Sequence, residues 1–206
     1  WLCGDHILEQ HIHNIDVANW FVGSYPVSAQ GMGGRQIRNG IDHGQIFDHH
    51  FVEFTYGNGT VISSQCRHQP GTMARVDEVF QGTEGSVVLG KGEIKNLLGD
   101  ITYSYPTNYW DSDNEPNPYQ VEHDMLFQSI REGNVISNTE YGAKSTLTAI
   151  MGRMATYTGK IISWEQVLNS KQKLVPDNLD WDSTPPVLPN KKGEYEIPKP
   201  GVTIID

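Results

Sequence analysis

Apolar residues along this sequence follow a helical period at first, short strand-like runs in the middle, and a helical period again towards the end. Residues 5–22 contain no glycine or proline. Within them, Ile7, Ile15, Ala18 and Val22 gather on one side when the segment is drawn as a helix. The first segment is therefore predicted to be one amphipathic helix whose apolar side faces a core.

The middle of the chain is predicted to consist of short strands. Residues 47–56 and 60–68 are rich in strand-forming residues and flank the turn sequence Gly57-Asn58-Gly59, which is typical of a β-hairpin. The glycine-rich residues 26–36 that precede them are expected to be extended. Closely spaced strands of this kind indicate an antiparallel meander. Further short strands, separated by glycines, are predicted at 73–80, 86–89, 93–97 and 101–105.

Helical spacing returns in the last third of the chain. Helices are predicted at 117–132, 140–158 and 163–170, the first of them with Asn117 as its N-cap. Helix, strands and then helices predict an α+β fold, with an open, mainly antiparallel β-sheet and helices packed on one face. Residues 1–170 are assigned to this domain, and residues 171–206 to an irregular, proline-rich C-terminal tail.

Composition excludes some classes of partner. The 206 residues include 15 Lys and Arg against 25 Asp and Glu, a net charge of −10, which argues against binding to nucleic acid. No apolar run is long enough for a membrane span, so no membrane association is expected. The two cysteines, Cys3 and Cys66, allow one disulfide at most and do not fix the redox compartment.

The polar side of the predicted helix 5–22 is the strongest candidate for chemistry. On a continuous helix, Glu9, His13, Asp16 and Trp20 fall within about 60° of arc, and no Lys or Arg accompanies them. A carboxylate four residues before an imidazole can fix the tautomer of that ring and raise its basicity, as a general base requires. The alternative is an ordinary solvated helix face.

Three other motifs carry weaker signals. Gly31-Met32-Gly33-Gly34 resembles a nucleotide-binding loop, but the GxGxxG spacing fails at Gln36. Cys66-Arg67-His68 could hold an activated thiol, although a buried cysteine packed as a small hydrophobe is favoured. His11 and His13 point apart on a helix and no third ligand follows at motif spacing, so no metal is assigned.

Taken together, these motifs resemble the C-terminal half of the Gfo/Idh/MocA oxidoreductases, and most closely the branch common in Bacteroidetes. The family pattern in the helix is a carboxylate, three residues, a histidine and then an Ile-Asp pair, and here Glu9 stands in place of the more usual Asp. The resemblance rests on Glu9, His13, Ile15-Asp16, Cys66-Arg67-His68, the run 141–160 and Ser163-Trp164-Glu165.

The resemblance implies an oxidoreductase that uses NAD or NADP to oxidise or reduce a hydroxyl of a sugar, cyclitol or glycoside. In that family, His13 would remove the hydroxyl proton, Glu9 would orient His13, and Asp5, His6 and Asp16 would line the substrate site. A preceding Rossmann domain would hold most of the cofactor. The chain starts at Trp1 without that domain's glycine fingerprint or Glu-Lys-Pro motif, so we expect the substrate and oligomerisation domain alone, inactive by itself.

Further expectations concern assembly and location. The free face of the sheet is expected to form a homo-oligomer, because strands covered on one side only leave their other face exposed. Relatives of this kind are cytoplasmic or exported in folded form, and the sequence does not choose between the two. Two alternatives to the enzyme stay open: a non-catalytic binding or oligomerisation module, and a metal-assisted lyase or hydrolase built on the histidines.

Overall fold

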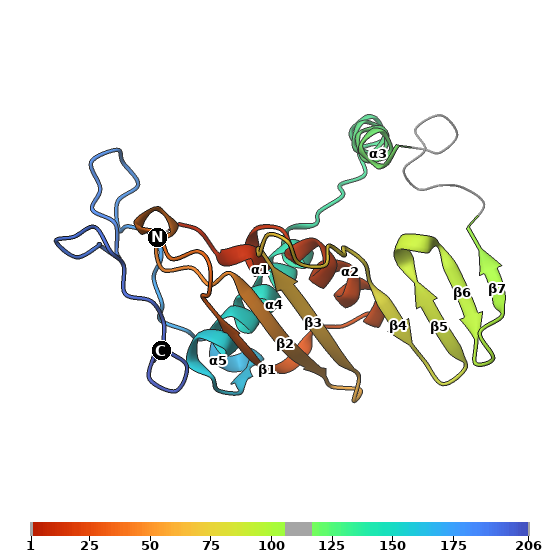
Figure 1. Ribbon diagram of the computed structural model, residues 1–206. Coiled ribbons are helices and arrows are strands. Elements are labelled where there is room, and N and C mark those ends of the chain that lie inside the picture. The colour runs from red at the N-terminus through yellow and green to blue at the C-terminus, as the bar shows by residue number, and fades with distance from the viewer. Residues whose placement is uncertain (1, 106–116, 206) are drawn as a thin grey trace. The chain divides into compact units, whose positions relative to one another are not determined.

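The structure is a computed structural model that describes residues 2–105 and 117–205. These residues form two compact units, coloured along the chain in Figure 1. The first unit spans Trp1–Thr72 and Gly142–Asp206, and the second spans Met73–Tyr141.

The first unit contains a four-stranded antiparallel sheet in the order β3-β2-β1-β8. Its strands are β1 (Pro26–Gly34), β2 (His49–Tyr56), β3 (Val61–Arg67) and β8 (Ile162–Ser163). The predicted hairpin is confirmed, since β2 and β3 pair in register from Thr55 opposite Val61 to His49 opposite Arg67. The residues of the turn were therefore sufficient to predict this hairpin.

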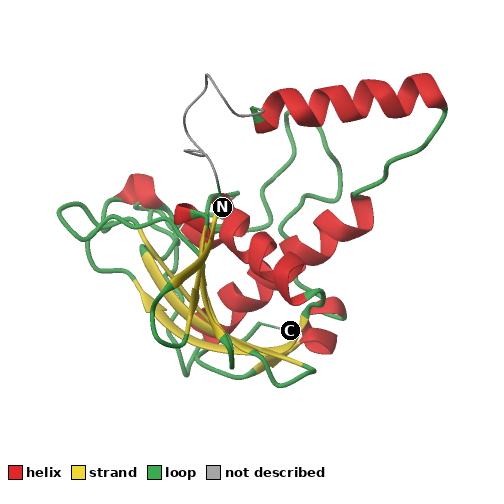
Figure 2. Cartoon of the chain, turned by 90° about the vertical axis from the view of Figure 1, so that its right-hand side faces the viewer, coloured by secondary structure: helices red, strands yellow, loops and turns green. Residues whose placement is uncertain are grey.

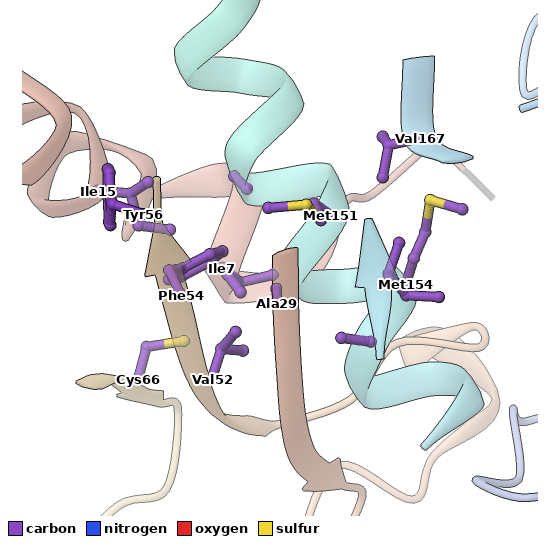
Figure 3. Close-up of a cluster of buried hydrophobic side chains, with 13 residues drawn as sticks. Ile7, Ile15, Ala29, Val52, Phe54, Tyr56, Cys66, Met151, Met154 and Val167 are labelled. Carbon is purple, nitrogen blue, oxygen red and sulfur yellow. The ribbon is translucent and has the colours of Figure 1, made fainter. Parts of the chain in front are cut away.

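Helices cover one face of that sheet. These are α1 (Asp5–Glu9), α2 (Ile12–Val22), α4 (Thr139–Thr158) and α5 (Trp164–Leu168), and Figures 1 and 2 show them against the same side of the strands. Alternate residues of β2 point into the layer between sheet and helices. The core shown in Figure 3 consists of Ile7, Ile15, Ala29, Val52, Phe54, Tyr56, Cys66, Ala149, Met151, Met154, Ala155, Ile162 and Val167.

The single helix predicted over residues 5–22 is wrong, because the structure divides it into α1 and α2. The backbone of Gln10 leaves the helical region, with φ −133° and ψ −44°. The arc that places Glu9 beside His13 on a continuous helix therefore does not apply across this break. Burial of Ile7 on one side of the break and Ile15 on the other holds both short helices on the sheet.

Strand β1 explains the glycine-rich segment. It lies in the middle of the sheet, between β2 and β8. A Cβ atom built on Gly31 would lie 2.4 Å from the carbonyl oxygen of Phe51 and 3.1 Å from Cγ2 of Thr156, and one on Gly33 would lie 3.2 Å from Cβ of Thr156. The glycines allow α4 to approach the sheet backbone closely, which is a packing role.

The second unit holds its own antiparallel sheet, in the order β4-β5-β6-β7. One sheet built from all the predicted strands is therefore a wrong prediction, although the α+β class with open antiparallel sheets is confirmed. The expected strand 73–80 is shorter in the structure. Only residues 79–81 pair with β5, and they form a strand of three residues. The strands are β4 (Val79–Gln81), β5 (Gly85–Val88), β6 (Glu93–Asn96) and β7 (Ile101–Ser104).

The predicted helices of the last third are found. Helix α3 (Pro118–Glu132) has Asn117 as its N-cap, and the side chain of Asn117 accepts a hydrogen bond from the backbone N–H of Tyr119 at 2.9 Å. Helix α5 begins at Ser163, which forms a capping box with Gln166. The described residues 171–205 contain turns and no helix or strand.

Candidate functional site

The first element of the site is a carboxylate at the start of α1. Asp5 has no exposed surface and adopts a positive φ of 66°, which is uncommon for a residue with a side chain. Its two oxygens accept from the hydroxyl of Tyr157 at 2.8 and 2.7 Å, and Oδ2 also accepts from the backbone N–H of Phe47 at 3.1 Å. Asp5 was expected to line the substrate site, but it lies beneath the surface and fixes the entry into α1.

Two basic side chains stand beside this carboxylate. Nε of Arg153 lies 3.5 Å from one Asp5 oxygen, and Nε2 of His50 lies 3.2 Å from the other. The Thr156 hydroxyl donates to the Arg153 carbonyl oxygen, so Nδ1 of His50 is the donor in its 3.0 Å bond to Thr156. Burial raises the pKa of Tyr157 far above its usual range, so its hydroxyl keeps the proton that it donates. The cluster links α1, β2 and α4.

An imidazole cluster lies next to the start of α1 and consists of His6, His11 and His68. The ring centroids of His6 and His68 are 3.8 Å apart and those of His6 and His11 are 6.4 Å apart. Nε2 of His11 lies 2.7 Å from the hydroxyl of Ser64. Burial lowers the pKa of His6 to about 4, with nearby bases adding to the effect, and burial lowers the pKa of His11 to about 4. Both rings are therefore neutral at pH 7.

The candidate catalytic pair is not joined in this structure. Glu9 is exposed, and its carboxylate accepts a hydrogen bond from the backbone N–H of Gly4 at 3.0 Å. It also borders a largely apolar cavity of about 420 Å³ together with Arg153. His13 is exposed near the start of α2. Among residues 2–105 and 117–205, no hydrogen bond or ion pair connects Glu9 to His13, which follows from the helix break between them.

Two other predicted residues carry buried polar atoms without partners. Oδ1 of Asp16 and Nδ1 of His6 are inaccessible to solvent and have no hydrogen-bond partner in the described part of the chain. A buried acceptor or donor left in this state is destabilising by about 1–3 kcal/mol unless something satisfies it.

Asp48 is a structural residue of the site that sequence reasoning missed. Its side chain is fully buried, and Oδ2 accepts from the backbone N–H groups of Gln36, Ile37 and Arg38 at 2.8, 2.7 and 3.1 Å. Burial alone would raise the pKa of this carboxyl, but His49 and the three N–H donors hold it far below its usual range. An Asp just before a strand gives no signal that its partners lie ten or more residues earlier.

The remaining motifs have structural explanations. Cys66 faces the core (Figure 3), and burial raises the pKa of its thiol to about 12, as expected for a packed and unreactive cysteine. Across the described ranges, no three His, Cys, Asp or Glu side chains converge to hold a metal ion. No helix in the same residues has the length and apolar character to cross a membrane.

No protein-family model and no protein of curated function matches this sequence. Solved structures do match. The scyllo-inositol dehydrogenase from Lactobacillus casei, with bound NAD(H) and scyllo-inositol, is 18% identical with a TM-score of 0.58, over 80% of this chain and 50% of that one. The chain has the fold of one half of this dehydrogenase.

Two further dehydrogenases share this fold. The myo-inositol 2-dehydrogenase from Lactobacillus plantarum is 18% identical over 78% of this chain and 48% of that one, with a TM-score of 0.58. The WlbA dehydrogenase from Bordetella pertussis, in complex with NADH and UDP-GlcNAcA, is 15% identical over 78% and 46%, with a TM-score of 0.58. The chain thus spans about half the length of these proteins.

Proposed function

We propose that this chain is the substrate-binding half of a Gfo/Idh/MocA-type oxidoreductase that uses NAD or NADP and acts on a hydroxyl of a sugar, cyclitol or glycoside. The observation that carries the proposal is the shared fold with inositol dehydrogenases, in a chain whose α1–α2 segment bears Glu9 and an exposed His13. Fold alone does not define chemistry, so the residues of the site must supply the rest.

In this proposal His13 is the general base. Its exposed imidazole accepts the proton of the substrate hydroxyl, and a nicotinamide cofactor held mainly by another domain would supply the hydride acceptor. Asp16 supplies the unsatisfied Oδ1 as an acceptor for a second substrate hydroxyl. Glu9 is assigned to orient His13, which requires it to exchange its bond to Gly4 for one to the ring.

The described residues do not fit a whole dinucleotide. The glycine-rich strand β1 has a superficial likeness to a phosphate loop, but α4 fills the space beside its Gly31 and Gly33. A pyrophosphate site needs backbone N–H groups at a helix start, which this strand does not offer. The proposal therefore assigns the cofactor mainly to a preceding domain, and this chain by itself is expected to be inactive.

The same proposal includes self-association through the free face of the first sheet. Met32 is 72% exposed on β1, Val61 is 55% exposed at the start of β3, and Phe51 lies opposite Met32 on β2. Apolar side chains on an uncovered sheet face gain stability from burial against a second copy.

Substitution of His13 tests the function. In the full-length enzyme, His13→Ala is expected to lower kcat by about 10²–10⁴-fold with a much smaller change in KM, because a general base acts mainly in the transition state. His123→Ala removes an exposed histidine from α3 and should leave kcat unchanged. Turnover by His13→Ala close to that of the wild type would refute the role of His13.

A further inference from the structure

The loop after β1 is held from two sides. The carboxylate of Asp48 accepts three consecutive backbone N–H groups, the last from Arg38. The guanidinium of Arg35 donates to the backbone carbonyls of Arg38, Gly40 and Gly44. A loop fixed through both its N–H and its C=O groups presents its side chains in a defined direction.

The backbones of Arg38 and His68 are both anchored on Asp48. The backbone N–H of Arg38 binds the side chain of Asp48, and the backbone N–H of His68 binds the carbonyl oxygen of the same residue at 2.8 Å. The ring of His68 in turn stands 3.8 Å from that of His6. The charge of Arg38 contributes to lowering the pKa of both His6 and His68, after burial and, for His6, after the neighbouring imidazoles.

The cluster of Arg38, His6 and His68 has donors that the chain does not use. The Arg38 side chain is half-buried, and within the described ranges no hydrogen bond or ion pair engages its guanidinium. Nδ1 of His6 is buried and has no partner there either. The carboxylate of Asp48 accepts from three N–H groups and contacts His49, and within the described ranges it makes no hydrogen bond or ion pair with the Arg38 guanidinium.

We propose that Arg38, His6 and His68 bind an anionic group of the substrate, a carboxylate or a phosphate carried by the sugar. This assignment to the substrate rests on the function proposed above. A guanidinium pairs with either group through two parallel N–H donors, and each imidazole adds a donor. A bound anion favours the protonated imidazoles, so affinity rises as the pH falls from 7 to 5.5. His11 and His50 are the other titratable groups that act on His6.

The first experiment compares three sugars against the 206-residue chain by isothermal titration calorimetry. D-glucuronate carries a carboxylate, glucose 6-phosphate carries a phosphate, and glucose carries neither. At least one of the two anionic sugars should bind ten-fold or more tightly than glucose, and more tightly at pH 5.5 than at pH 7. The better ligand identifies the anion. Equal binding of all three sugars would overturn the proposal.

Variants then assign the effect to the cluster. Arg38→Gln should abolish the preference for the anionic sugar, because only the backbone of Arg38 is needed to hold the loop. Arg38→Lys keeps the charge and should retain the preference at reduced strength. Arg131→Gln, which removes a cation from α3, should behave as the wild type. Retention of the full preference by Arg38→Gln, with an unchanged circular dichroism spectrum, would overturn the assignment.

The two proposals fail separately. A full-length enzyme that depends on His13 but shows no preference for anionic sugars would leave the oxidoreductase proposal standing and refute the anion site. Anion binding that depends on Arg38, in an enzyme whose turnover does not depend on His13, would support the anion site and refute the role of His13.

Discussion

The hydroxyl of Tyr157 donates to the carboxylate of Asp5, which lies 152 residues earlier in the chain, at 2.8 and 2.7 Å from its two oxygens. The same hydroxyl accepts from the guanidinium of Arg153 at 3.1 Å. This contact joins the end of α4 to the start of α1, one residue before His6. The position of the imidazole cluster therefore depends on a buried polar contact between two distant helices.

Tyr157→Phe should reduce the free energy of unfolding by about 1–3 kcal/mol, because it leaves a buried carboxylate without its hydroxyl donor. Urea denaturation followed by tryptophan fluorescence measures the loss. Tyr119→Phe, at a residue that is 74% exposed on α3, is the matched control and should change stability little. Equal stability of Tyr157→Phe and the wild type would show that the Asp5 contact contributes nothing.

The chain should lose stability as the pH falls from about 6.5 towards 4. His6 and His11 have a pKa of about 4 in the folded state, against an ordinary histidine pKa of 6.5. Over that interval the unfolded chain binds more protons than the folded one, so protonation favours unfolding. Denaturant midpoints measured at pH 7 and pH 5 test this, and the double variant His6→Gln and His11→Gln should show a smaller difference. If the double variant shows the same difference in midpoint as the wild type, other residues cause the sensitivity to acid.

Two glycines of α4 should respond to alanine in opposite ways. A Cβ on Gly152 would lie 2.8 Å from Cζ of Phe54 and 3.0 Å from Cδ1 of Ile7, so Gly152→Ala should destabilise by about 1–3 kcal/mol through overpacking. Gly142 has nothing within 4 Å, and Gly142→Ala should stabilise by about 0.5–1 kcal/mol through helix propensity. Thermal denaturation of both variants checks the pair, and a gain in stability for Gly152→Ala would contradict the packing described for α4.

Self-association should weaken when a charge is placed on the free sheet face. Met32→Glu puts a carboxylate among the exposed apolar residues of β1 and should shift the oligomer towards monomer, because burying that charge is unfavourable. Light scattering after size-exclusion chromatography gives the mass. Met73→Glu, at a residue 70% exposed in the second unit, is the control and should not change it. A wild-type chain that stays monomeric at high concentration would exclude this interface.

Elements with local signals could be predicted from the sequence. The turn at Gly57-Asn58-Gly59 defines the β2–β3 hairpin because φ above zero at Gly59 suits glycine. Asn117 and Gly133 define both ends of α3 for similar reasons. His6 and Asp16, which the family resemblance assigns to the substrate site, have buried polar atoms without partners in the described residues, and their role in binding stays a prediction. These signals lie within a few residues of the structure that they specify.

Other features were decided only by the tertiary structure. The break at Gln10 lies in a segment with no helix breaker, and the division of the strands into two sheets depends on which partners they find. The burial of Asp5 needs Tyr157 and Arg153, and that of Asp48 needs a loop ten residues earlier. A buried charge is stable only when distant groups satisfy it, and no local pattern in the sequence shows which groups those are.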